Sequence, residues 1–396
     1  MTDHAARIAR AALARSLAAE APPPVPAAAV AAAARKAAAK PAAAERLPGL
    51  DGLRVVAVLA VVAFHLLFRG PVSGWTGVPF PAVEGVAAYG YAGVDLFFVI
   101  SGFVIAWSSE GRSPLAFARA RLLRLWPAFV VCMTVTALVL ALARDPNFPI
   151  GPAMWVANLI FLPQLLGQPF VDGAYWSIVT ELTFYGWVFL AMALGLWPRR
   201  IAEIGLVWLA VSLVNLFLGS AILDRLFLTS FAGEFLGGVV LYRIRAEGQK
   251  PILLALLTAS VFVAVVHSVP YSGGLDRLYG FKADPAAVVL VHFAIFGLVA
   301  AAAAARVPAR LAGLTLAAGG ATYPAYLLHQ NIGYVLIDRL VPAGVPGPLA
   351  ALLITAGVFG LAWVVWARIE PAGRRLLAPI LDRAIARLPA AIGGGR

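Results

Sequence analysis

The stretch GLDGLRVVAVLAVVAFHLLFRG, residues 49–70, indicates which class of fold this chain adopts. Its apolar part is long enough for a helix that crosses a bilayer, and it contains one imidazole, His65, eleven positions after Arg54. Eleven residues are about three turns of an α-helix, so both side chains are expected on one helix face, about 16 Å apart. An ionisable side chain inside a span is costly, and the pair therefore indicates a shared functional cavity. The alternative is that Arg54 extends to the cytoplasmic interface while His65 bonds a neighbouring helix.

The composition predicts an integral membrane protein. Hydrophobic residues make up 62% and charged residues 13% of the 396 residues, and the mean hydropathy is +0.88. A soluble chain of this length cannot bury so much apolar surface. About ten apolar runs are long enough to span a bilayer, and they predict an all-α, polytopic membrane bundle. The runs lie near residues 52–68, 88–107, 125–143, 176–197, 201–223, 226–242, 251–269, 285–305, 315–337 and 347–367.

The basic residues follow the positive-inside rule. If the amino terminus is cytoplasmic, 24 of the 31 Lys and Arg residues lie on the cytoplasmic side and Arg54 lies within the first span. Six lie on the other side, namely Arg69, Arg144, Arg225, Arg277, Lys282 and Arg339. Both termini are therefore expected in the cytoplasm. The net charge of +12 does not indicate nucleic-acid binding, because the basic residues lie between apolar runs rather than in one basic domain.

Three parts of the chain differ in composition. Residues 1–47 are rich in alanine and proline with scattered basic residues, and we expect a largely disordered cytoplasmic extension. Its first residues could also form a basic amphipathic helix on the membrane, and their composition is similar to that of an organelle transit peptide. Residues 48–370 form the predicted transmembrane domain. Residues 371–396 are expected to be a basic amphipathic tail along the inner membrane surface.

Further polar side chains interrupt the apolar runs and must find partners or water within the bundle. They are Asp95, Glu181, Glu234, His292 and His329. His292 stands alone between aliphatic residues, so we interpret it as a structural histidine. The single cysteine, Cys132, lies in an apolar run and offers neither a disulfide framework nor a cysteine metal site.

The segment SPLAFARARLLRLWPAF, residues 113–129, carries three arginines just before an apolar run. Arg121 and Arg124 are three positions apart and so project from nearly the same side of a helix. On charge alone, an ordinary positive-inside anchor explains Arg119, Arg121 and Arg124 equally well. Guanidinium pairs also suit bidentate binding of phosphate, so a phosphorylated donor arriving from the cytoplasm would meet these arginines.

Five blocks together resemble the acyltransferase-3 family of polytopic membrane acyltransferases, which modify extracytoplasmic carbohydrates such as lipopolysaccharide O-antigens, capsules and exopolysaccharides. The blocks are LPGLDGLRVVAVLAVVAFH, GVDLFFVISGFVI, FARARLLRLWPAF, AYWSIVTELTFY and ATYPAYLLHQNI. They occur in the family's order across roughly residues 47–340, so the resemblance covers the predicted membrane domain. The chain stops shortly after its last span, and we therefore expect the stand-alone form without a fused esterase-like domain.

The resemblance implies an O-acyltransferase of the bacterial cytoplasmic (inner) membrane. It implies transfer of an acyl group, usually acetyl from acetyl-CoA as co-substrate, to a hydroxyl of a carbohydrate or lipid-linked glycan on the far side of the bilayer. No GxSxG elbow or plausible thiol nucleophile is present, so we expect no serine- or cysteine-linked acyl enzyme. Direct transfer and transfer through an acyl-histidine remain open. We expect no metal and no tightly bound cofactor, and the sequence does not report the oligomeric state.

Each candidate residue receives a role on this reading. A histidine can act as general base on a hydroxyl, and His65 is assigned that role. Arg54 would stabilise charge or hold the donor, and Glu181 would orient a histidine or bind the acceptor. His329 is a second acid or base, or a structural partner in the same cavity. Arg119, Arg121 and Arg124 would bind the CoA phosphates, and Asp95, Trp176 and Ser177 are assigned to substrate binding.

The rival interpretation from another class is a proton-coupled secondary transporter of a small polar solute. Asp95, Glu181 and the histidines would then form a proton relay. The sequence shows no paired broken helices and no inverted halves, which are typical of such transporters. A transporter would also need no CoA, so donor binding discriminates between the two functions.

Overall fold

The computed structural model describes residues 47–387. The extension predicted before residue 48 therefore lies, apart from Leu47, outside the described residues, and so does the end of the predicted tail. Within residues 47–387 all regular secondary structure is helical. The α-helices are α3 (Pro48–Ala63), α4 (Gly70–Val72), α5 (Glu84–Ala87), α6 (Gly93–Ser109), α7 (Pro114–Ala143), α8 (Pro152–Leu159), α9 (Trp176–Ala193), α10 (Ile201–Leu218), α11 (Ala221–Phe227), α12 (Ala232–Glu247), α13 (Pro251–Tyr279), α14 (Pro285–Ala304), α15 (Ala309–Leu328), α16 (Gln330–Leu340), α17 (Gly347–Val364) and α18 (Glu370–Ala386).

Short irregular helices connect or extend these elements. Two π-helical segments, η1 (Phe64–Arg69) and η6 (Val365–Ile369), continue α3 and α17 without a break. Four 3₁₀ turns precede longer helices or lie in loops, and they are η2 (Ala88–Ala92), η3 (Gln164–Leu166), η4 (Gly173–Tyr175) and η5 (Thr229–Phe231).

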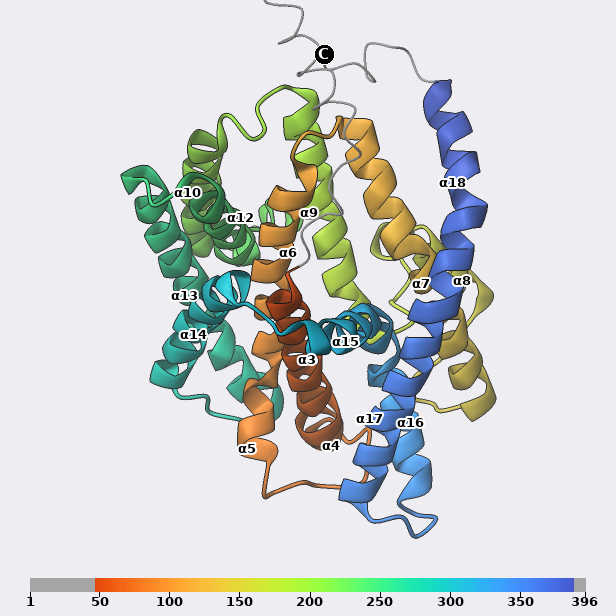
Figure 1. Cartoon of the computed structure of the whole chain (residues 1–396). Coiled ribbons are helices and arrows are strands. Elements are labelled where there is room, and N and C mark those ends of the chain that lie inside the picture. The colour runs from red at the N-terminus through yellow and green to blue at the C-terminus, as the bar shows by residue number, and fades with distance from the viewer. Residues whose placement is uncertain (1–46, 388–396) are drawn as a thin grey trace, which may run out of the picture. The chain divides into compact units, whose positions relative to one another are not determined.

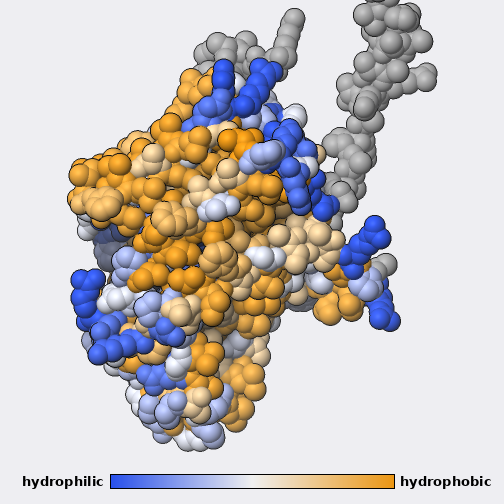
Figure 2. All heavy atoms as spheres, turned by 90° about the vertical axis from the view of Figure 1, so that its left-hand side faces the viewer, coloured by the Kyte–Doolittle hydropathy of each residue, from blue (hydrophilic) through white to orange (hydrophobic). Residues whose placement is uncertain are grey.

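The predicted polytopic bundle is confirmed. Eight helical stretches of the described residues are long and apolar enough to cross a membrane, and they match eight of the ten predicted runs. They cover residues 48–72, 84–109, 114–143, 173–193, 201–218, 251–279, 285–304 and 347–386. A ninth, formed by α11 and α12 with η5, is bent by 56° at Leu228. Figure 2 shows the result on one face, where a broad hydrophobic band lies between more hydrophilic ends.

The remaining predicted run, residues 315–337, is not one continuous helix. It is divided at His329 into α15 and α16, because two side chains near the start of α9 take the backbone groups that would pair there. The backbone N–H of Asn331 donates to Asp172 Oδ2 at 2.9 Å, and the carbonyl of Leu327 accepts from the Tyr175 hydroxyl at 3.0 Å. In an unbroken α-helix this N–H and this carbonyl would pair with each other.

Glycines allow α6 and α12 to pack with their backbones close together. A Cβ atom on Gly102 of α6 would overlap the carbonyl oxygen of Phe235, and one on Gly238 of α12 would overlap that of Val99. Small residues at such contacts are typical of membrane helix pairs. Asp95 and Glu234 stand in the first turns of these two helices, which brings their carboxylates into the same region.

The amino-terminal end of α3, which carries Arg54, does not reach the end of the bundle at which several other helices end (Figure 1). In Figure 1 its N-terminal end lies well below the upper ends of α6, α7 and α9, and the α6–α7 and α9–α10 connections are both at that upper end. Those connections are two of the segments predicted to be cytoplasmic. Arg54 stands in the second turn of α3, and only 17% of its side chain is exposed.

Candidate functional site

The first notable feature of the interior is a hydrogen-bonded pair of buried histidines. His65 Nδ1 lies 2.9 Å from His329 Nε2, although the two residues come from opposite ends of the membrane domain. The side chains are 6% and 1% exposed. The structure therefore brings together two of the residues that the sequence predicted to be catalytic.

Backbone carbonyls determine which ring nitrogen of each neutral histidine carries the proton. His329 Nδ1 is 2.7 Å from the carbonyl of Tyr326, which can only accept, so Nδ1 carries the proton and Nε2 is an acceptor. His65 Nδ1 faces that acceptor and also the carbonyl of Val61 at 2.9 Å, so it too must donate. His65 Nε2 therefore carries a lone pair that is not used within the pair, and its neighbour is Arg69, whose Nη1 lies 3.4 Å away.

Local irregularity of the helices places this pair. His65 belongs to the π-helical segment η1, and such segments occur frequently at functional sites. His329 stands at the break between α15 and α16 that Asp172 and Tyr175 create. Both histidines thus lie where the regular backbone pattern is interrupted.

Arg69 is a site residue that the sequence reasoning missed. Its Nη1 atom is 3.4 Å from His65 Nε2, and its guanidinium lies 5.2 Å from the centre of the Trp75 ring. The sequence did contain a signal, because residues four positions apart share a helix face. Tyr334 lies on this side of the pair, with its ring 6.5 Å from that of His65 and with a buried hydroxyl that has no hydrogen-bond partner in the described part of the chain.

A cavity of about 90 Å³ is connected to the pair through Tyr326, which lines it and whose carbonyl contacts His329 Nδ1. Three predicted arginines line it, Arg54 from α3 and Arg121 and Arg124 from α7, together with Glu181 from α9. Arg54 is paired with Asp51 at 2.7 Å, whereas no ion pair is found for Arg121 or Arg124 within residues 47–387. Positive charge therefore predominates, and the space suits an anionic or strongly polar ligand of the size of a few waters or a small acyl group.

Glu181 is held by hydroxyl groups and not by a histidine. Its Oε1 atom accepts from Ser101 at 2.7 Å and from Tyr185 at 2.5 Å. The sequence prediction offered this carboxylate either as a partner that orients a histidine or as part of the acceptor site. Glu181 lines the same cavity as the three arginines, so it lies next to the space in which a ligand would bind.

Tyr326 connects the cavity to the histidine pair. It lines the cavity, its hydroxyl lies 2.7 Å from Ser177 Oγ, and its carbonyl accepts from His329. Ser177 also lines the cavity. We expected Arg54 and His65 to face one shared cavity. In the structure Arg54 lines the cavity and His65 does not, and Tyr326 connects the cavity to the histidine pair.

Three predicted residues lie away from the cavity and the histidine pair. Arg119 is on the surface of α7 and forms a bidentate ion pair with Asp382 of α18, at 2.5 and 2.9 Å. Trp176 stacks on Phe231, with ring centres 5.5 Å apart. Asp95 belongs to a separate buried group with His292.

Comparison with known proteins identifies relatives of the chain. The family described as "Acyltransferase domain" matches residues 47–367. The chain is 29% identical to "Acyltransferase MdmB" of Streptomyces mycarofaciens over 176 residues, which are 41% of this chain and 42% of that protein. It is 31% identical to "O-acetyltransferase OatA" of Staphylococcus aureus (strain NCTC 8325 / PS 47) over 160 residues, 35% of this chain and 23% of that protein. The match thus spans less than half the length of both relatives, and no solved structure matches the chain.

Proposed function

This chain belongs to the acyltransferase domain family, and from that membership we propose that it transfers an acyl group from cytoplasmic acyl-CoA to a hydroxyl on the far side of the membrane. The acceptor in this proposal is a carbohydrate or a lipid-linked glycan, and the acyl group is acetyl. The similarity to O-acetyltransferase OatA supports the acetyl group. A bacterial inner membrane would provide the two compartments that this reaction requires.

The observation that carries the proposal is the lone pair on His65 Nε2, which is contacted by the Arg69 side chain and not by the other histidine. A neutral imidazole held in one tautomer is suited to remove a proton from a hydroxyl near neutral pH. His329 accepts from the opposite nitrogen of His65 and so holds the ring while His65 becomes cationic. His65 is thus the general base of the proposed reaction, and His329 is a positioning residue.

The proposed step balances as a direct transfer. The acceptor hydroxyl gives its proton to His65 Nε2, its oxygen forms a bond to the thioester carbonyl carbon, and the carbon–sulfur bond breaks. The proton then passes from His65 to the CoA sulfur, which leaves as a thiol. Arg69 lies beside the reacting nitrogen, where its charge can stabilise the oxyanion that forms on the thioester carbonyl.

The donor occupies the cavity in this proposal. A space of about 90 Å³ is too small for the nucleotide of CoA, so in this proposal the nucleotide stays outside, the pantetheine arm passes through the cavity, and the acyl end lies beyond Tyr326 at His65. Arg121 and Arg124 bind phosphate at the cavity wall, where guanidinium groups form strong charge-assisted hydrogen bonds. Arg54 holds the donor deeper in the bundle, and Ser177 and Glu181 contribute polar contacts to the substrates. Trp176 and Arg119 have no direct contact in this scheme.

The test uses the full chain purified in lipid nanodiscs and supplied with acetyl-CoA and a soluble oligosaccharide. Release of CoA thiol and transfer of labelled acetyl are measured for the wild type, for His65→Asn and for the control His267→Asn. Asn at position 65 keeps a donor for His329 but has no base, so we expect the rate to fall by about 10²- to 10⁴-fold. His267 bonds Ser212 on α10, away from the site, and its variant is expected to keep the wild-type rate.

Two results would overturn the proposal. A His65→Asn variant as active as the wild type would mean that this histidine is not the base. A folded wild type that neither binds nor consumes acetyl-CoA would remove the donor from the scheme. In that case, solute uptake that depends on a proton gradient would favour the transporter interpretation.

A further inference from the structure

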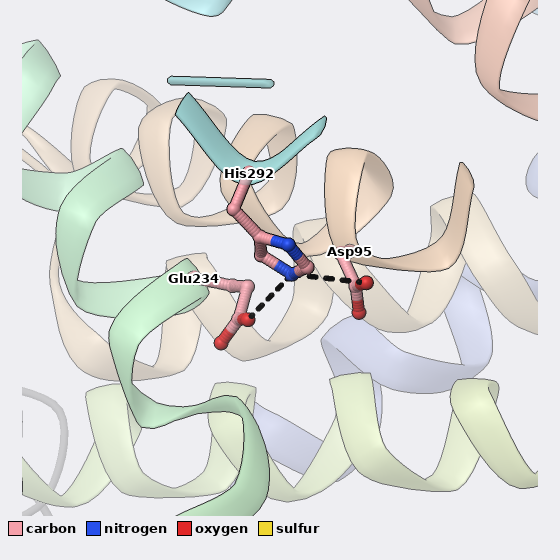
Figure 3. Close-up of side chains that lie close together, drawn as sticks. All are labelled: Asp95, Glu234 and His292. Carbon is pink, nitrogen blue, oxygen red and sulfur yellow. Dashed lines mark ion pairs between the residues drawn. The ribbon is translucent and has the colours of Figure 1, made fainter. Parts of the chain in front are cut away.

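A second buried cluster of ionisable groups lies outside the proposed active site. Asp95 of α6, Glu234 of α12 and His292 of α14 converge from three helices, as Figure 3 shows. His292 Nε2 is 3.4 Å from Asp95 Oδ2 and 3.9 Å from Glu234 Oε1. The three side chains are 6%, 1% and 0% exposed, and none of them lines the arginine cavity.

The histidine of this cluster is oriented as a metal ligand would be. His292 Nδ1 lies 2.9 Å from the carbonyl of Val288, so in the neutral ring this nitrogen carries the proton. The lone pair is therefore on Nε2, which faces both carboxylates and lies 2.8 Å from Ser268 Oγ of α13. A metal-binding histidine typically donates its other ring N–H to a backbone carbonyl or a carboxylate in this way.

Glu234 provides an independent indication that a ligand is involved. Among residues 47–387, both of its carboxylate oxygens are buried without a hydrogen-bond partner, and Oε1 is directed toward His292 Nε2 (Figure 3). A buried carboxylate without a hydrogen bond is strongly unfavourable. Two carboxylates and an imidazole lone pair also repel one another unless a proton or a metal cation lies between them.

We propose that Asp95, Glu234 and His292 bind a divalent transition metal ion, with Zn²⁺ the favoured ion. The potential ligand atoms all lie within 4.8 Å of one another. The observed 3.4 Å between His292 Nε2 and Asp95 Oδ2 equals the ligand separation of about 3.4 Å in a tetrahedral site with bonds of about 2.1 Å. Ser268 Oγ or a water supplies the fourth ligand.

Charge and ligand type both favour this ion. A divalent cation with two carboxylates and a neutral imidazole has no net charge, which suits a buried position in a membrane bundle. A nitrogen ligand favours Zn²⁺ over Mg²⁺ and Ca²⁺, which prefer oxygen. The ion would connect α6, α12 and α14, and its role in this proposal is to stabilise the bundle and not to react.

The sequence predicted no metal site here and took His292 for a structural histidine. The reason is that each ligand comes from a different helix, so no short ligand spacing appears in the chain. Proximity of the three depends on the close packing of α6 on α12.

The test measures metal in the full chain, purified without a polyhistidine tag or chelator from cells grown with added zinc. We expect about one zinc per chain by mass spectrometry of the metal, and we expect zinc to raise the Tm of chelator-treated wild type while Mg²⁺ does not. The variants His292→Ala, Glu234→Gln and Asp95→Asn should each lose the metal. His267→Ala is the matched control and should retain it.

The wild type alone can overturn the proposal, even if a variant does not fold. Folded wild type without bound metal, and without a change of Tm on addition of Zn²⁺ or Mn²⁺, would mean that protons and not a metal neutralise the carboxylates. Equal zinc content in folded wild type and in His292→Ala would likewise place the metal elsewhere. Metal content and Tm are independent of acyl transfer, so this result stands apart from that of the acetyl-CoA assay.

Discussion

Replacing His329 by alanine tests whether the histidine pair acts as one unit. The substitution removes the acceptor that lies 2.9 Å from His65 Nδ1, so only the carbonyl of Val61 remains to hold the ring. A hydrogen bond to a group that becomes charged is worth about 1.5–3 kcal/mol. At about 1.36 kcal/mol per tenfold change, the rate of acetyl transfer should fall by about 10- to 150-fold.

The matched variant is His329→Gln. Its side-chain oxygen can replace Nε2 as the acceptor, so we expect it to recover most of the lost rate, and it also controls for the volume removed by alanine. The KM for acetyl-CoA should stay the same in both variants, because His329 does not line the arginine cavity. Initial rates of thiol release are compared on protein that elutes as a single folded species in nanodiscs.

Two outcomes would refute this reasoning. If His329→Ala is as fast as the wild type, the hydrogen bond between the histidines has no part in the reaction. If His329→Gln is as slow as His329→Ala although it is folded, an acceptor at this position is not sufficient. His329 would then have to take up a proton itself, as an acid or base.

Three further substitutions test other parts of the structure. Arg124→Gln should raise the KM for acetyl-CoA by about 10- to 150-fold with little change in kcat, whereas Arg119→Gln, at an exposed ion pair, should leave initial rates unchanged. Gly238→Ala introduces a methyl group against the carbonyl of Val99, so it should destabilise the bundle by about 1–3 kcal/mol and lower the Tm. Gly186 has open space around it, and Gly186→Ala should leave the Tm unchanged. Asp172→Asn leaves one buried backbone N–H without an acceptor, which costs about 1–3 kcal/mol. Because Asp172 then no longer holds the break at His329, both the Tm and the transfer rate should fall.

The class of fold was predictable because lipid leaves the chain few choices. A long apolar run must satisfy its own backbone hydrogen bonds within the bilayer, so each run predicts a helix wherever the chain packs. Eight of the ten predicted runs fall in continuous helical stretches of the structure, and the bend at Leu228 changes only the course of a ninth. The run at residues 315–337 was predicted wrongly as one helix, since its break depends on side chains from another part of the chain.

The candidate site was predictable only residue by residue. Ionisable side chains within apolar runs stand out in a sequence, which is why His65, His329 and Glu181 were identified. Arg121 and Arg124 were identified because they lie three positions apart just before an apolar run. Arg69 was overlooked because it reads as a charge at the end of a span.

The sequence by itself determined the membrane helices and the identity of the polar residues inside them, because periodicity and hydropathy are local properties of the chain. Tertiary structure alone decided which of those residues meet. The break at His329 and the close contact of α6 with α12 both involve contacts between distant segments of the chain. That packing depends on shape and on hydrogen-bond partners from other helices, which no single segment specifies.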